Sequence, residues 1–206
     1  MKLNERGLLI VISGPSGVGK GTVRKALFEM TGHDLVYSVS MTTRPIRPGE
    51  VNGKDYFFVT KDEFEHRIKE NGFLEWAEFV GHYYGTPLDK IEDQLNKGKE
   101  VVLEIEVQGA LQVKQKMPDA VFIFIGPPSM KDLENRLIHR GTDSLDVIHQ
   151  RMDKALREIG LAHRYDYIVI NDEVHNAADR IMAIIRAEHA KTERSIYKYQ
   201  EIMGVK

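Results

Sequence analysis

The sequence predicts an α/β protein with a parallel sheet core flanked by helices, and three observations support that prediction. Four short apolar runs suit strands that are buried on both faces, namely 8–12, 101–105, 120–125 and 167–170. Amphipathic helical segments separate these runs, and strand–helix alternation is typical of a parallel sheet. The chain has 206 residues, 42% of them hydrophobic and 29% charged, which is enough for one packed core with an insertion or two.

Composition excludes several classes of protein. The 29 Lys and Arg balance 31 Asp and Glu, so no global charge favours nucleic acid or a membrane surface. The chain has no cysteine, which excludes disulfides, thiolate catalysis and Cys-ligated metals. Apolar runs such as 8–12 are far shorter than the ~20 residues of a membrane span, and residues 1–7 carry no secretory signal. We therefore expect a cytoplasmic protein without nucleic-acid or membrane partners.

The first strand is followed by a helix. Val23, Ala26, Leu27 and Met30 recur at i, i+3, i+4 and i+7, the spacing of one helical face. The last helix is expected over 177–199, with Ile181, Ile184 and Ile185 as its buried stripe.

Two segments differ from this pattern. Residues 39–88 are rich in Tyr, Phe, Gly, Thr and Arg, and predict a small, partly β insertion. Thr60 and Glu63 form a capping-box pattern, which predicts a helix over 61–70. Residues 129–152 carry many charges and little apolar density, which indicates a helical flap. The core is then left with 1–38, 89–128 and 153–206.

The strongest motif lies directly after the first strand. The Gly-rich segment 13–22 has the spacing of a P-loop, in which successive backbone N–H groups and a helix N-terminus surround a phosphate. Lys20 supplies a positive charge to the terminal phosphates. A plain glycine-rich turn is the alternative, but the buried strand before the loop and the helix after it favour the P-loop.

One position departs from the strict P-loop pattern. Gly21 stands where Ser or Thr normally reaches Mg²⁺, and Thr22 follows it. Thr22 supplies the nearest hydroxyl and is therefore the candidate metal contact. A GTPase is disfavoured, because residues 96–99 lack the aspartate of the Asn-Lys-x-Asp motif.

Five further segments extend the pattern along the chain. They are 38–45 with Arg47, 49–56, 72–77, 83–86 and 104–109. With the loop, they closely resemble the guanylate kinase family, in that family's order and spacing. The resemblance implies a P-loop nucleoside-monophosphate-kinase architecture with a GMP-binding insertion over 39–88 and a lid over 129–152. It also implies phosphoryl transfer from ATP to GMP, direct and in-line, with Mg²⁺ arriving with ATP; it leaves the oligomeric state open.

The resemblance assigns residues to the acceptor phosphate. Arg44 and Arg47 bind it, and Tyr56 and Tyr84 donate hydrogen bonds beside them. Arginines and phenols suit a phosphate with nearly two negative charges. Solvated loop arginines and core tyrosines are the alternative.

The resemblance also assigns residues to the guanine base. Guanine presents N1–H and N2–H donors on one edge and the O6 and N7 acceptors on the other, so a selective site needs carboxylates and hydroxyls. Glu75 and Glu104 match the family's carboxylates, and Ser40 and Thr86 match its hydroxyls. A solvated carboxylate is the alternative for Glu75, although its apolar flanks disfavour full exposure.

A second acidic position lies two residues beyond Glu104. Glu104 and Glu106 are expected on one face of the strand, at the end where ligands bind in open α/β sheets. The family usually has Asp where Glu106 stands, and we expect Glu106 to order Mg²⁺ or its waters. A solvent-facing edge is the alternative.

The ATP side completes the assignment. By resemblance, Arg136, Arg140 and Arg151 of the flap close over the phosphates, with Lys20 and Arg44 as further catalytic residues. A charged, solvated helix is the alternative for the flap. Two rivals remain, a kinase for another phosphorylated acceptor and a non-catalytic binding module of guanylate-kinase type. The residues assigned to ATP binding are Gly14, Pro15, Ser16, Gly17, Val18, Gly19, Lys20, Gly21, Thr22 and Asn171.

Overall fold

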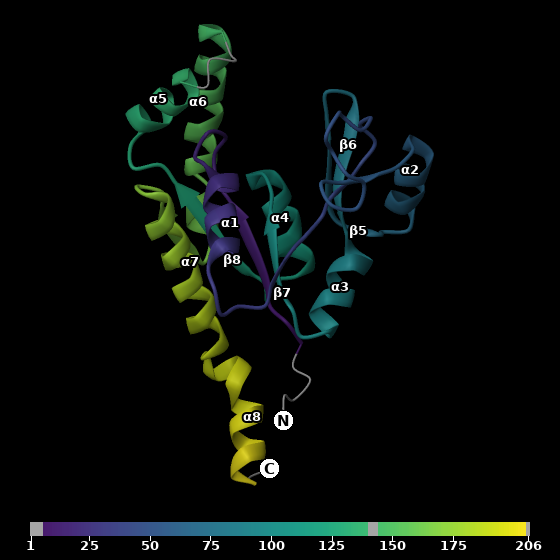
Figure 1. The fold of residues 1–206 in the computed structure, drawn as a ribbon, viewed down its shortest axis with the longest axis vertical. Coiled ribbons are helices and arrows are strands. Elements are labelled where there is room, and N and C mark those ends of the chain that lie inside the picture. The colour runs from purple at the N-terminus through teal and green to yellow at the C-terminus, as the bar shows by residue number, and fades with distance from the viewer. Residues whose placement is uncertain (1–5, 140–143, 205–206) are drawn as a thin grey trace.

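A parallel sheet forms the core of the protein. The computed structural model describes residues 6–139 and 144–204. The five strands lie in the order β2-β7-β1-β8-β9, and every pairing is parallel (Figure 1). The four predicted strands are confirmed. Their bounds, with the unpredicted β2, are β1 (Leu9–Ser13), β2 (Leu35–Tyr37), β7 (Glu100–Glu104), β8 (Val121–Gly126) and β9 (Tyr167–Ile170).

Each face of the sheet has its own apolar layer. Side chains alternate across a strand, so Ile10 and Ile12 of β1 point to one face and Leu9 and Val11 to the other. Helices α1 (Lys20–Glu29) and α7 (Val174–His189) cover the first face. Helices α3 (Leu88–Asn96) and α4 (Val107–Lys116) cover the second. This arrangement leaves the carboxyl ends of the strands open for ligands.

The predicted insertion contains a second, smaller sheet. Its strand order is β4-β3-β6-β5, and helix α2 (Lys61–Lys69) packs on it with the predicted capping box of Thr60 and Glu63. Phe64 of α2 stacks on Phe73 with ring centroids 4.2 Å apart. The strand bounds are β3 (Met41–Thr42), β4 (Phe57–Phe58), β5 (Phe73–Phe79) and β6 (His82–Pro87).

Helix α4 joins the insertion to the core. The backbone N–H of Trp76 donates to Gln112 Oε1 at 3.2 Å, and Gln112 Nε2 donates back to the Trp76 carbonyl at 3.2 Å. Lys116 Nζ also donates to the Phe73 carbonyl, at 2.7 Å. Strand β5 is thereby held along one side of a core helix.

The predicted flap is the start of a helical arm. Helix α5 (Met130–His139) packs on α6 (Leu145–Ile159), and the turn η1 (Ala162–Arg164) follows. The expected lid boundary at residue 152 falls inside α6, which runs on into the core. This arm and the insertion stand on opposite sides of the open end of the sheet (Figure 1).

The single helix expected over 177–199 is wrong. Helix α7 ends at His189 and α8 (Thr192–Met203) begins after a break at Lys191, where ψ is 135°. Apolar periodicity continues past the break, but α8 has no buried residue, so this periodicity does not mark a core helix. Within the described ranges, no helix is long and apolar enough to cross a membrane.

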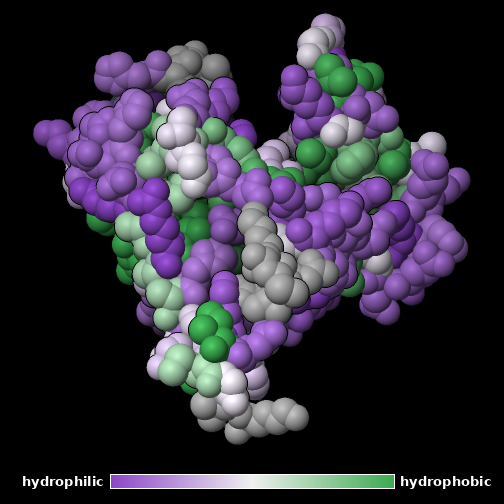
Figure 2. Space-filling view, turned by 60° about the horizontal axis from the view of Figure 1, so that its bottom comes forward, coloured by the Kyte–Doolittle hydropathy of each residue, from purple (hydrophilic) through white to green (hydrophobic). Residues whose placement is uncertain are grey.

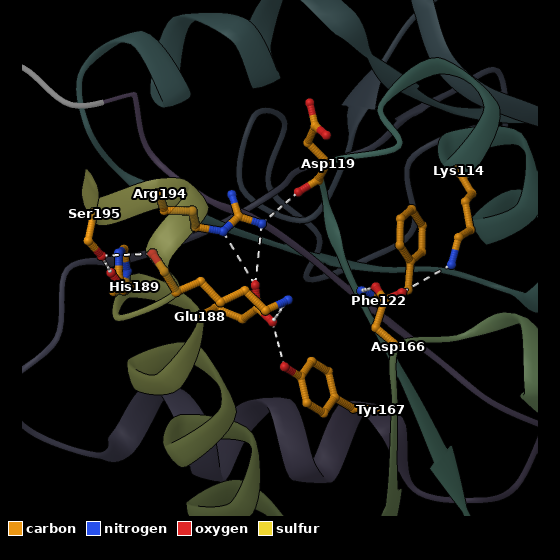
Figure 3. A network of polar contacts seen from close by, with 10 residues as sticks. Lys114, Asp119, Phe122, Asp166, Tyr167, Glu188, His189, Arg194 and Ser195 are labelled. Carbon is orange, nitrogen blue, oxygen red and sulfur yellow. Dashed lines mark hydrogen bonds and ion pairs between the residues drawn. The ribbon is translucent and has the colours of Figure 1, made fainter. Parts of the chain in front are cut away.

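A buried carboxylate organises the break between these helices. Glu188, 1% exposed in its side chain, accepts from Lys191 Nζ at 2.6 Å. It also accepts from Arg194 at 3.3 Å (Figure 3). The Tyr167 hydroxyl donates to the same carboxylate, and Arg194 also donates to the Asp119 carbonyl at 2.9 Å. Cations from the start of α8 therefore turn back to the end of α7.

Candidate active site

The glycine-rich loop lies at the carboxyl end of β1. Gly19, at φ 95°, is the N-cap of α1, so a left-handed residue turns the chain into the helix. A Cβ on Gly14 would lie 2.2 Å from the Ile125 carbonyl oxygen of the adjacent strand, which only glycine avoids. The loop therefore has both the backbone freedom and the helix N-terminus of an anion site.

Lys20 folds back over this loop. Its Nζ donates to the Gly14 carbonyl at 2.6 Å and to the Pro15 carbonyl at 3.2 Å. Burial lowers the Lys20 pKa, although the negative charges of Glu106 and Glu104 oppose that shift. The ammonium thus lies in the loop that is predicted to hold phosphate.

Helix α5 of the helical arm is hydrogen-bonded to the same loop. Arg136 Nη1 donates to the Val18 carbonyl at 2.9 Å and Nη2 to the Asn171 carbonyl at 2.8 Å. Asn171 Nδ2 also donates to the Val18 carbonyl, at 2.7 Å, while its buried Oδ1 has no partner among the described residues. Arg136 and Asn171, both predicted site residues, therefore meet at Val18.

The other two arginines predicted for the arm are Arg140 and Arg151. Arg140 lies outside the described residues. Arg151 lies on α6, close enough to Glu106 for its charge to stabilise that carboxylate.

The insertion carries a second cationic site. Arg44, 8% exposed, donates from both terminal nitrogens to Glu50, at 2.7 and 3.0 Å. The Arg44 guanidinium lies 5.5 Å from the ring centroid of Tyr56, whose ring meets that of Tyr84 edge-on at 6.0 Å. The hydrogen bonds that Arg44 donates to Glu50 raise the Arg44 pKa, so the guanidinium stays charged.

These residues border an open hollow. Arg44, Arg47 and Tyr84 line a cavity of about 460 Å³. Sequence reasoning gave Glu50 no role, although the carboxylate three residues after Arg47 in one loop was a signal. Glu50 also accepts from the Arg47 backbone N–H at 2.8 Å, so it shapes the loop that holds both arginines.

A buried carboxylate lies deeper in the insertion. The Thr86 hydroxyl donates to Glu75 Oε1 at 2.6 Å, and Glu75 is 7% exposed. Burial raises the Glu75 pKa, and the hydrogen bond from Thr86 partly offsets that rise. Met41 pairs with Gly85 in the antiparallel ladder, so the register brings Ser40 opposite Thr86. Three of the four predicted base-binding residues, Ser40, Glu75 and Thr86, thus lie together.

The fourth, Glu104, lies elsewhere. Its carboxylate is bound by Arg24 at 2.7 Å, and Oε1 lies 3.6 Å from the position of a Cβ on Gly21. Glu104 therefore faces the first turn of α1, where a strict P-loop has its metal-binding hydroxyl.

Glu106 is not on the strand, and the expected common face with Glu104 is wrong. Strand β7 ends at Glu104, and Glu106 is the N-cap of α4. A Cβ on Gly109, in the first turn of α4, would lie 2.9 Å from Glu75 Oε2. Glu106 thus lies at the helix end that Glu75 contacts. Burial tends to raise the pKa of Glu106, but the hydrogen bond from Lys154 and the charge of Lys20 outweigh that effect and lower the pKa.

The donors beside the loop fit a metal that arrives with a nucleotide. Mg²⁺ keeps several waters and uses one or two carboxylates plus phosphates. Glu104 offers such a carboxylate, and the described residues contain no cluster of three acidic, His or Cys side chains that could hold an ion alone. Thr22 is exposed and leaves the helix about 100° away from Gly21, so it does not face Glu104.

The two sites lie on opposite sides of one cleft. Figure 2 shows a notch between the helical arm and the insertion, and in Figure 1 the loop before α1 lies on the side of the arm. Lys20 and Arg44 are thus two cationic sites, one in the loop and one in the insertion. That arrangement suits transfer between two bound phosphates.

Comparisons with known proteins identify a family. A family model described as guanylate kinase matches residues 6–188. The guanylate kinase of Aster yellows witches'-broom phytoplasma (strain AYWB) is 65% identical over 204 residues, 98% of this chain and 97% of the relative. That of Streptococcus pyogenes serotype M3 (strain ATCC BAA-595 / MGAS315) is 58% identical over 203 residues, 98% and 96% of the two chains.

A solved structure supports the same assignment. The crystal structure of guanylate kinase from Anaplasma phagocytophilum has a TM-score of 0.75 and 38% identity, covering 97% of this chain and 96% of that one. The fold, the loop with its lysine and the sequence similarity over nearly the whole chain lead to one conclusion: this chain is a kinase that belongs to the guanylate kinase family.

Proposed function

We propose that this kinase transfers the terminal phosphoryl group of ATP to GMP, giving ADP and GDP. The observation that carries the proposal is the pairing of two anion sites across one cleft, Lys20 in the loop and Arg44 in the insertion. The buried Glu75–Thr86 pair belongs to the same insertion as Arg44, so a base and its phosphate can bind together.

The base site favours guanine. Glu75 accepts from N1–H and N2–H, which replace the Thr86 hydroxyl as its donors. The freed hydroxyl of Thr86 and that of Ser40 then donate to the acceptor edge. Adenine offers no donor at N1, so it would leave a buried carboxylate unpaired. A site of this kind can reject the wrong base by ~10⁴-fold or more.

We assign the two remaining carboxylates in the reverse of the sequence expectation. Glu104 faces Gly21 in the first turn of α1 and suits the metal side. Glu106 shares the N-terminus of α4 with Glu75 and suits the guanine side.

Transfer needs positioning and charge neutralisation rather than covalent catalysis. Lys20 and the loop N–H groups hold the ATP phosphates, and Arg44, Arg47, Tyr56 and Tyr84 hold the acceptor phosphate. Arg136, Arg140 and Arg151 neutralise the charge that develops between them. Asn171 Oδ1, which is buried and has no partner in the part of the chain that the structure describes, can accept from the adenine amine of ATP. A bound Mg²⁺ would neutralise phosphate charge beside Glu104.

A coupled assay of ADP release tests the proposal. Wild-type protein with Mg·ATP is offered GMP, AMP, UMP or dTMP separately, at equal concentration. Turnover with GMP alone is the expected result, because only guanine satisfies the Glu75 site. Turnover with another acceptor would contradict the base assignment, and no turnover with any would return the protein to the binding-module class.

A further inference from the structure

Lys154 connects the helical arm to the carboxylate that we assign to the guanine side. It lies on α6, and its Nζ is 2.7 Å from Glu106 Oε2 and 3.5 Å from Glu158 Oε1. The side chains of Lys154 and Glu106 are about half exposed, at 48% and 55%, and the charge of Lys20 in the glycine-rich loop acts on Glu106, so the ion pair lies near that loop. A single lysine in a charged helix gave no signal in the sequence.

One carboxylate oxygen of Glu106, Oε1, has no hydrogen-bond partner among the described residues. Its side chain makes no capping hydrogen bond to α4, and among the described residues its hydrogen bonds use Oε2 alone. An ionised carboxylate can accept at both oxygens. Glu106 can therefore hold Lys154 with one oxygen and an N–H group of a base with the other.

Glu158 keeps Lys154 in place. It lies one helical turn after Lys154, on the same face of α6, and its side chain is only 7% exposed. A buried carboxylate has little freedom to move, so the ammonium between it and Glu106 has a fixed location.

We propose that Lys154 is a positioning residue for the acceptor base, holding Glu106 so that its second carboxylate oxygen faces the exocyclic amine of guanine. The inference rests on the proposed function. Its physical basis is preorganisation, because a long carboxylate that is already ordered loses less freedom when the base binds. Arg151 lies three residues before Lys154 on α6, so the same ion pair links the base site to the arm that carries an arginine for the phosphates.

The exocyclic amine makes the proposal testable. GMP carries this amine and inosine monophosphate lacks it, while both share the rest of the base-reading edge. We would measure the affinity of both by calorimetry, without ATP or metal, for wild type, Lys154→Met, Lys154→Arg and Glu106→Gln. Lys154→Met should weaken GMP about fivefold, the upper range for a half-exposed ion pair, and leave inosine monophosphate nearly unchanged. Lys154→Arg should keep wild-type behaviour.

A double variant separates positioning from general damage. In Glu106→Gln the part of the GMP preference that depends on Glu106 should already be lost, so adding Lys154→Met should change little further. Glu158→Gln reports on effects that pass through the buried carboxylate, and melting temperatures report on folding. If Lys154→Met fails to fold, Lys154→Gln, which keeps a polar head group, replaces it.

Two results would overturn the inference. One is an equal loss for both nucleotides in Lys154→Met, and the other is an undiminished effect of that substitution in the Glu106→Gln background. Failure of the proposed function has a different signature, since wild-type protein would then neither bind GMP nor phosphorylate it.

Discussion

At the residue scale, the negative charge of Glu75 favours GMP binding but destabilises the fold. Its carboxylate is buried beneath the cleft, with Thr86 as its hydrogen-bond donor. Burial raises its pKa, so the charged form that a guanine N–H needs is the form that the empty protein disfavours. Removing the charge should therefore affect the two properties in opposite directions.

Glu75→Gln should weaken GMP and strengthen the fold. We expect the KM for GMP to rise by roughly tenfold to a hundredfold, the loss of a charged hydrogen bond, with a much smaller change for ATP. The desolvation cost is present above the raised pKa and is relieved as pH falls through it. The variant should thus have a higher melting temperature than wild type at pH 7. The difference between the two melting temperatures should decrease in mildly acidic buffer.

The same titration should appear in binding by wild-type protein. GMP affinity should fall as pH drops through the raised pKa of Glu75, above the ordinary value of 4.5. Glu78→Gln, an exposed position on the same strand, is the matched control. A parallel rise in KM for ATP and GMP would remove Glu75 from base recognition.

Lys20→Met should lower kcat on the order of 10³-fold, because a fixed charge aimed at the reacting phosphates is lost. The coupled assay of ADP release measures this effect. Lys25→Met removes an exposed lysine from the same helix and should leave kcat unchanged. A loss below tenfold for Lys20→Met would take the loop out of the mechanism.

Sequence alone predicts some of these residues better than others. Lys20 follows from a motif whose spacing, strand and helix all appear in the chain. Arg24 and Lys154 do not, because their partners Glu104 and Glu106 are distant in the sequence and are brought close only by folding. Glu50 differs from them, since its partners Arg44 and Arg47 lie in the same loop. Glu104 and Glu106 show the same limit, since two residues of separation imply one face only if the strand continues, and β7 ends between them.

At the element scale, the joint between α7 and α8 depends on a charge rather than on packing. Glu188 is buried, while α8 contributes no buried side chain of its own. Helix α8 is therefore held by Lys191 and Arg194 at its start. Apolar periodicity could not show this break, because the spacing of apolar residues indicates which face of a helix is hydrophobic and not where the backbone turns. Strand β2 was missed for a related reason, since its three half-buried residues form a short edge.

Glu188→Ala should destabilise the protein by about 2 kcal/mol, less than a fully buried pair because Lys191 and Arg194 are partly exposed. Denaturant unfolding measures this change, with the exposed Glu193→Ala as control. Desolvation opposes the charge of Glu188, but Lys191 and Tyr167 outweigh it and lower the pKa. The contribution should be complete above pH ~4.5 and lost as pH falls through the lowered pKa. Equal effects of the two substitutions would contradict the anchoring role.

At the scale of the whole molecule, the protein is two arms on one rigid sheet. The insertion is attached through α4, and the helical arm is attached to the loop through Arg136. In the proposed function the insertion binds GMP and the loop with the helical arm binds ATP, so each arm would close on its own ligand. Closure of both would exclude water from the phosphates.

Small-angle scattering should resolve these two closures. We expect the radius of gyration to decrease with GMP and to decrease again with a non-hydrolysable ATP analogue. Arg44→Ala should lose the first step and Lys20→Met the second. A single step that needs both nucleotides would show that the arms move as one unit.

The position of Trp76 gives the protein a built-in optical reporter. It is the one tryptophan in the 206-residue sequence, and it lies where β5 meets Gln112 of α4. Its ring meets Tyr83 edge-on, with centroids 5.8 Å apart, inside the insertion. Intrinsic emission on selective excitation therefore originates at the seam between insertion and core, and the helical arm is spectroscopically silent. Stopped-flow fluorescence of unlabelled protein can thus time the movement of one arm without interference from the other.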